Sequence, residues 1–290
     1  MRRAISTTLV FGLVIVGGIA AAPINTDTAL PVHKGEILWR EQIRFMQASD
    51  SVSKMRVTAV PSVFVFGVTE KLALIGMAPF LDKELAMDGI ERRSSGLGDT
   101  TLLGRYQVFQ SDRPGETRRA QVLAGVKLPT GDNEKRDAFG ILPRPLQPGS
   151  GSVDGMIATV FTVQRLKWQA DFDVAYRKNG EHDGFRFGSS VTHNAALQYR
   201  LWPGELPEHG IPDYVYGVLE LNGVWAYRDE LQGTTIRDSG GYTLFVSPGV
   251  QYVTKRWIAE ASVQLPLVRN LNGAQPEPDY TVAAGFRIQY

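Results

Sequence analysis

Apolar and polar residues alternate along most of the chain with a period of two residues. In a β-strand this period places alternate side chains on opposite faces. In the last segment Arg287 lies on the polar face, and the opposite, apolar face includes Tyr280, Phe286, Ile288 and Tyr290. The pattern predicts strands with one face toward lipid and the other toward water.

Twelve segments carry this pattern, and most are about ten residues or longer, which is enough to cross a bilayer at a tilt. Strands of a soluble β-sandwich average only about 5–6 residues. We therefore predict an all-β fold, an antiparallel transmembrane β-barrel of about 12 strands over residues 37–290, with both termini in the periplasm. The predicted strands are 37–48, 54–66, 71–80, 97–110, 118–129, 153–164, 168–178, 185–200, 214–228, 241–253, 257–268 and 280–290.

Short connections alternate with long ones, as in bacterial outer-membrane barrels with short periplasmic turns and longer outer loops. The predicted long connections are 81–96, 129–154, 229–240 and 270–279.

The first residues resemble a secretory signal sequence. Arg2 and Arg3 precede an apolar run from Leu9 to Ala22, which ends in small residues and is too short to span a membrane as a helix. We expect residues 1–22 to be a cleaved signal peptide and residues 23–36 to be a short periplasmic segment. The expected location is the outer membrane of a Gram-negative bacterium.

Composition removes several classes of function. Lys and Arg total 31 and Asp and Glu total 30, so no basic excess supports nucleic-acid binding. The chain has no cysteine, which excludes disulfides and thiolate metal sites. No metal site or other cofactor is predicted, because the four histidines are scattered at His33, His182, His193 and His209.

Three stretches resemble one bacterial family. They are SGLGDTTLLGRY (Ser95–Tyr106), LAGVKLPTGDNE (Leu123–Glu134) and the Gly-rich loop and strands of residues 149–180. In this order they are similar to the outer-membrane family called MetA-pathway of phenol degradation, over about residues 57–290. The resemblance implies a barrel that takes up aromatic or other hydrophobic compounds, and it transfers no defined functional residues.

Larger channels for hydrophobic compounds carry an N-terminal plug inside the barrel. Only residues 23–34 precede the first predicted strand here, and so short a segment argues against a full plug. The loop from Pro129 to Asp154 is the better candidate for folding inward as a constriction.

The polar faces of the strands define the predicted lumen. Asp171 and Asp173 share one face, either as a cation site or, as we favour, as part of a wet wall paired with Arg105, Arg119, Lys127 or Arg287. The residues expected to line a transport path are Arg105, Gln107, Arg119, Lys127, Asp171, Asp173, Glu220, Glu260 and Arg287. The apolar face of the last strand is expected to be the signal for barrel assembly.

His193 falls on the predicted lipid face near Ser189 and Ser190, which raises the alternative of a lipid-modifying barrel enzyme. Ser189 would lie roughly 13 Å away along the strand, too far for a hydrogen bond, and no orienting partner is apparent. No catalytic residues and no enzyme activity are therefore predicted.

These features favour a passive outer-membrane channel for small, hydrophobic or aromatic solutes. A polar-solute porin and a non-transporting structural or adhesive barrel remain alternatives. The expected partners are the solute, outer-membrane lipid with lipopolysaccharide, and the barrel assembly machinery.

Overall fold

The computed structural model describes residues 22–207, 210 and 212–290. Apart from Ala22, the expected signal peptide lies outside the described residues. No described segment forms a helix long and apolar enough to span a membrane. The long strands are β1 (Ile37–Ser49), β2 (Ser53–Gly67), β3 (Leu72–Met87), β4 (Ile90–Leu97), β5 (Thr100–Arg113), β6 (Glu116–Leu128), β9 (Asp154–Arg165), β10 (Trp168–Lys178), β13 (Ser190–Trp202), β14 (Tyr214–Ala226), β17 (Gly241–Val253), β18 (Trp257–Leu271) and β19 (Glu277–Gln289).

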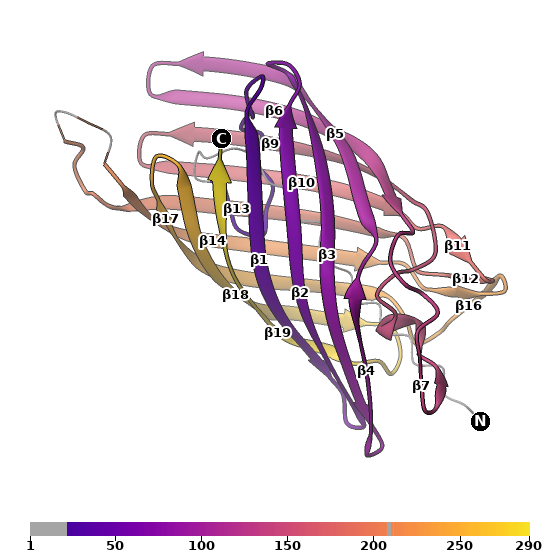
Figure 1. Ribbon diagram of the computed structural model, residues 1–290. Helices are drawn as coiled ribbons and strands as arrows, with labels where there is room; N and C mark the ends of the chain where they lie inside the picture. The colour runs from indigo at the N-terminus through magenta and orange to yellow at the C-terminus, as the bar shows by residue number, and fades with distance from the viewer. Residues whose placement is uncertain (1–21, 208–209, 211) are drawn as a thin grey trace.

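These strands form one antiparallel sheet that closes on itself (Figure 1). The order is β2-β1-β19-β18-β17-β14-β13-β10-β9-β6-β5-β3, and β2 pairs with β3 to close the barrel. β4 and β5 both pair with β3, on either side of a break at Gly98 and Asp99, so they fill one position in the wall. The described residues thus form a barrel of twelve wall strands, which confirms the predicted fold.

The two ends of the barrel differ in their connections. We call one the short-turn end, which has the turns 68–71, 114–115, 166–167 and 254–256. The other, the long-loop end, has the connections 129–153, 179–189 and 227–240. Those connections contain the 3-10 turn η1 (Arg144–Leu146) and the short strands β7 (Arg136–Asp137), β8 (Gly140–Ile141), β11 (Glu181–His182), β12 (Phe185–Arg186), β15 (Glu230–Leu231) and β16 (Thr234–Thr235).

On most wall strands polar side chains point inward and apolar side chains point outward, whereas the inward face of β2 and β3 is mainly apolar. On β10, Asp171 and Asp173 are buried, whereas Phe172 is 50% exposed and Val174 is 51% exposed. This alternation agrees with the sequence pattern and gives the barrel an apolar outer surface suited to lipid.

The predicted long connection at residues 81–96 is wrong, because β3 and β4 continue through it as a hairpin. Met87 pairs with Ile90 across the turn. The two turn residues, Asp88 and Gly89, have φ values of 50° and 76°, as a tight two-residue hairpin turn requires. An Asp-Gly pair is a strong signal for such a turn, and it marks this hairpin in the sequence.

Candidate transport path

The N-terminal segment, residues 22–32, lies inside the barrel. Every residue from Ala22 to Leu30 is buried. The chain then reaches the short-turn end, where the N–H of Gly35 donates to the carbonyl of Gly67 at 2.8 Å. The short length of this segment argued against a full plug, yet the segment fills part of the lumen, since a chain can advance about 3.3–3.6 Å per residue and reach across it.

Glu220, on β14, holds the first part of this segment. Its carboxylate accepts hydrogen bonds from the backbone N–H of Ile24 at 2.7 Å and of Asn25 at 2.9 Å and 3.0 Å. It also accepts one from Thr26 Oγ1 at 2.8 Å. Buried backbone N–H groups need hydrogen-bond acceptors. In a sheet these are carbonyl groups of a neighbouring strand, and here the carboxylate of Glu220 takes their place.

Asp27 joins the middle of the segment to the wall. Arg105, on β5, donates to both carboxylate oxygens of Asp27 at 2.7 Å and 3.0 Å. The N–H of Asp27 donates to Asp173 on β10 at 2.9 Å, and the N–H of Ala29 donates to Thr162 Oγ1 on β9 at 2.7 Å. Three wall strands therefore fix this part of the segment.

Glu260, on β18, lies at the centre of a buried ion-pair cluster. It pairs with Arg40 of β1 and with Arg287 of β19, each at 2.6 Å. The same two guanidinium groups donate to the backbone carbonyls of Ile24 at 2.6 Å and Pro23 at 2.5 Å. The wall thus satisfies the carbonyl groups of the segment as well as its N–H groups.

Asp171 and Asp173 receive hydrogen bonds from neutral donors. Asp171 accepts from Thr162 Oγ1 at 2.6 Å and from Gln169 Nε2 at 2.8 Å, and Asp173 accepts from Asn194 Nδ2 at 2.7 Å. The prediction that Asp171 and Asp173 form ion pairs is wrong for the described residues. Other carboxylates, on the wall strands and on Asp27 of the segment, pair with the predicted cations instead. The predicted cationic partners were Arg105, Arg119, Lys127 and Arg287.

The structure brings most of the predicted path residues together around the N-terminal segment. Gln107 and Arg119 lie nearer the short-turn end, where they contact Gln110 at 2.5 Å and Asp112 at 3.5 Å. Lys127 lies nearer the long-loop end, and its place in a transport path, like that of the others, stays a prediction. The residues grouped around the segment are Arg105, Asp171, Asp173, Glu220, Glu260 and Arg287.

β1 supplies further inward polar residues that the predicted set omitted. Arg40, Gln42 and Arg44 are all buried, and they alternate with outward residues of the same strand. Arg44 donates to Asn25 Oδ1 of the N-terminal segment at 3.1 Å. The period-two pattern that predicts the other lumen residues is also present in β1, and it places these three side chains on the inner face.

A cavity of about 330 Å³ lies between the N-terminal segment and the long-loop end. Asn25 of the segment and Gln147 of the loop 129–153 both line it. Its volume lies at the lower end of the range of about 300–1,000 Å³ that is usual for small-molecule sites. The apolar part of its wall includes Met46, Met55, Val57, Met77, Leu81 and Phe245.

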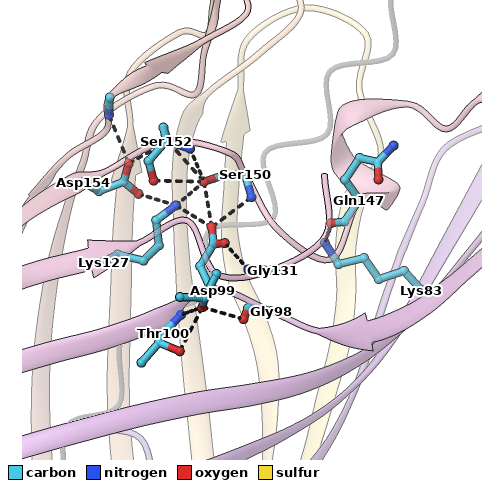
Figure 2. Close-up of polar contacts among 12 residues, drawn as sticks. Lys83, Gly98, Asp99, Thr100, Lys127, Gly131, Gln147, Ser150, Ser152 and Asp154 are labelled. Atoms are coloured by element: carbon cyan, nitrogen blue, oxygen red, sulfur yellow. Dashed lines mark hydrogen bonds and ion pairs between the residues drawn. The ribbon is translucent and has the colours of Figure 1, made fainter. Parts of the chain in front are cut away.

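A cluster of polar residues fastens the loop 129–153 beside this cavity (Figure 2). We call it the latch, and it comprises Asp99, Lys127, Ser150, Ser152 and Asp154. Asp99 accepts from the N–H and Oγ of Ser150 at 2.9 Å and 2.7 Å, and from Lys127 Nζ at 2.9 Å. Lys127 also pairs with Asp154 at 2.9 Å, and Asp154 accepts from Ser152 Oγ at 2.9 Å.

The inner part of the loop, residues 142–150, packs inward, as predicted, whereas residues 132–141 are mostly exposed. Leu146 is fully buried in a cluster that includes Met55, and Lys83 Nζ donates to the carbonyl of Gln147 at 2.6 Å. Farther out, side-chain hydrogen bonds from Arg92 lower the pKa of Asp137 below its usual value. The loop is therefore held on the barrel at both its inner and outer parts.

His193 lies on the outer face, as predicted, beside an aromatic partner. Its Nε2 is 3.1 Å from the hydroxyl of Tyr242, and the two rings are stacked with centroids 5.7 Å apart. This contact gives the histidine a structural partner other than a serine. Within the described residues, no group of three or more His, Asp or Glu side chains is placed to hold a metal ion.

Residues 56–267 match the family described as "Putative MetA-pathway of phenol degradation". The chain belongs to this family. No curated protein sequence matches the chain.

Among solved structures, this MetA-pathway family member is similar to the COG4313 outer membrane channel from Pseudomonas putida F1, with a TM-score of 0.67 and 14% identity, covering 89% of this chain and 97% of that one. It also matches the β domain of the Bordetella autotransporter BrkA, with a TM-score of 0.48 and 12% identity over 89% and 100% of the two chains. A match to the CymD monoaromatic hydrocarbon channel has a TM-score of 0.42 and 9% identity over 89% of each chain. The fold is that of an outer-membrane β-barrel.

The sequence stretches that carry the family resemblance meet at the latch. Asp99 comes from the first stretch, Lys127 and Gly131 from the second, and Ser150 from the third. The N–H of Gly131 donates to Asp99 Oδ1 at 3.0 Å. A Cβ on Gly149 would lie 2.3 Å from the carbonyl oxygen of Gly131, so only glycine permits this approach. These motifs therefore have a structural role, namely to hold the loop against the barrel.

Proposed function

We propose that this protein is a passive outer-membrane channel for small hydrophobic or aromatic compounds. The observation that carries the proposal is a cavity of about 330 Å³ whose wall is apolar in large part, and which the N-terminal segment separates from the short-turn end. A porin for polar solutes has an open polar lumen. Here the polar lumen is filled, and the remaining space suits an apolar molecule.

Two comparisons support the proposal. The description of the family refers to phenol degradation, and the Pseudomonas putida structure of the same fold is named an outer membrane channel. Passage through such a barrel requires no covalent chemistry.

In the proposed path the solute enters at the long-loop end, occupies the cavity and leaves when the N-terminal segment moves. The segment is polar and is held largely by hydrogen bonds, for example those of Glu220 and Asp27. A hydrogen bond exchanged for water costs only about 0.5–1.5 kcal/mol net, or about 1.5–3 kcal/mol where a charge is involved. Displacement of the segment would exchange these contacts for water, and it would also release Ala29 and Val32 from a buried apolar cluster.

The test compares a hydrophobic probe with sugars. Cells of a Gram-negative host that express the protein receive 1-N-phenylnaphthylamine, whose fluorescence rises as it passes the outer membrane. We expect its initial rate of entry to rise several-fold over cells with the empty vector. In parallel, liposomes that contain the purified protein should swell no faster in arabinose or sucrose than empty liposomes.

Two results would contradict the proposal. Unchanged probe entry, with folded protein present in the outer membrane, would leave a structural or adhesive barrel. Rapid swelling in sugars would instead identify a porin for polar solutes. Folding is checked by the slower migration of unheated protein in detergent gels.

A further inference from the structure

The cavity is lined unevenly by charged groups. Six cationic side chains face it, whereas only two carboxylates do, Asp99 and Asp154. The whole chain is nearly neutral, with a net charge of +1, so this excess is local. The cations are Arg40, Arg44, Lys83, Lys127, Arg144 and Arg177.

Both cavity carboxylates are already engaged in the latch. Asp99 and Asp154 share Lys127 as their ion-pair partner, each at 2.9 Å. Their remaining oxygen positions accept hydrogen bonds from backbone N–H groups and serine hydroxyls, including the N–H of Gly180 at 3.0 Å. Neither carboxylate therefore forms an ion pair with another cation that lines the cavity.

Three of the cations form no direct ion pair with a carboxylate of the described residues, although carboxylates lie within electrostatic range. Lys83 donates only to backbone carbonyls of the loop, those of Pro145 at 3.0 Å and Gln147 at 2.6 Å. Arg44 donates to two neutral amide oxygens. The guanidinium of Arg177 forms no hydrogen bond or ion pair with the described residues, although its backbone pairs in the sheet.

Two of these three cations, Arg177 and Lys83, lie next to the latch, Arg177 through strand register and Lys83 through its contacts with the loop. Lys127 on β6 lies opposite Asp154 on β9, and Arg177 on β10 lies opposite Met156, two residues farther along β9. Lys83 contacts the same loop segment, residues 145–150, that Lys127 contacts through Ser150 (Figure 2). Buried cations without a direct carboxylate partner are costly to keep, and an anion bound in the cavity would offset part of that cost.

We propose that the cavity binds organic carboxylates with an apolar body, such as aromatic acids, and that Arg177, Lys83 and Arg44 attract their carboxylate group. The apolar wall receives the ring, and a guanidinium can hold a carboxylate through two parallel hydrogen bonds. Such acids are ionised at neutral pH, since an ordinary carboxyl group has a pKa of about 4. This inference rests on the proposed function and names the class of solute that it carries.

The test measures binding, and it needs no transport. Isothermal titration calorimetry of the purified full-length protein in detergent micelles compares 2-naphthoate with 2-naphthamide, its neutral counterpart of nearly equal shape. Titrations into protein-free micelles correct for partition into detergent. We expect naphthoate to bind at least tenfold more tightly than the amide.

Arg177→Gln is the decisive variant, because Arg177 has no described partner whose loss would disturb the fold. It should weaken naphthoate binding about tenfold and leave the amide unchanged, and Arg177→Glu should abolish naphthoate binding. Lys178→Gln is the matched control, since it removes the same charge one residue farther along β10, on the exposed outer face. It should bind naphthoate like the native protein.

Three outcomes would overturn the inference. The amide could bind as tightly as naphthoate, Arg177→Gln could leave naphthoate binding intact, or neither ligand could bind. The first two leave the proposed channel for neutral hydrophobic compounds standing, and the uptake experiment above decides that function separately.

Discussion

At the scale of single residues, buried polar groups in this barrel have specific partners, and those partners fix segments that have no regular structure. Asp99 is the clearest case, because its carboxylate receives four hydrogen bonds from Lys127, Gly131 and Ser150. Removing one member of a buried ion pair leaves the other charge uncompensated and costs about 3–5 kcal/mol. Asp99 is therefore a main determinant of the position of the loop.

Asp99→Ala should release the loop 129–153 without unfolding the barrel, because the wall strands keep their ladders. Trypsin can cut this loop after Lys135 or Arg136 once it leaves the barrel. We expect cleavage at least tenfold faster than in the native protein, measured by mass spectrometry of the fragments. Glu134→Ala, a change at an exposed side chain of the same loop, serves as the control. Equal cleavage rates for the native protein and Asp99→Ala would show that the latch does not hold the loop.

At the scale of elements, the sequence predicts strands well and the segments between them poorly. Period-two alternation locates the wall strands, because one face of each strand meets lipid and the other meets the interior, which is polar on most strands and apolar on β2 and β3. It fails at residues 81–96, where β3 and β4 extend past the apolar belt and outward residues such as Asp82 and Arg93 are paired with each other. The sequence of the N-terminal segment shows no periodicity. Its polar residues contact several different strands, so their spacing along the chain follows no regular pattern.

The lipid-facing side of the strands carries a prediction of its own. Phe172→Arg should destabilise the barrel by about 2–4 kcal/mol, because Phe172 lies at the middle of β10 and an arginine there would face the bilayer core. Urea unfolding in lipid vesicles, followed by tryptophan fluorescence, measures the change. Phe172→Leu keeps the site apolar and should remain within about 1 kcal/mol of the native protein. A silent Phe172→Arg would mean that this face does not contact lipid.

At the scale of the whole molecule, the barrel is narrowed from two directions. The N-terminal segment fills the half near the short-turn end, and the loop 129–153 covers part of the cavity near the other. The sequence places side chains such as Glu220 and Arg105 on the inner face, but it cannot show that they bind the segment. Which side chains bind the segment depends on the path of an irregular chain in three dimensions. Which face of the wall a side chain lies on depends only on the two-residue period of the strand.

A disulfide that ties the segment to the wall tests whether its movement opens the path. Thr28 Oγ1 and Thr162 Oγ1 are 3.2 Å apart, so cysteines at both positions are close enough to join, and the chain has no cysteine of its own to interfere. In Thr28→Cys/Thr162→Cys, oxidation should reduce entry of 1-N-phenylnaphthylamine to the level of the empty vector, and dithiothreitol should restore it. Each single variant, treated in the same way, should be insensitive to both reagents.

Entry that persists in the oxidised double variant would mean that solute leaves the cavity without displacing the N-terminal segment. The segment would then be a permanent part of the wall, held for stability, and the exit would have to lie elsewhere between the cavity and the membrane. Entry that stops on oxidation and returns on reduction would instead identify the segment as the moving barrier. Thr28 and Thr162 do not line the cavity, so neither the disulfide nor its reduction should change the affinity for naphthoate. The experiments on movement of the segment and on binding are therefore independent.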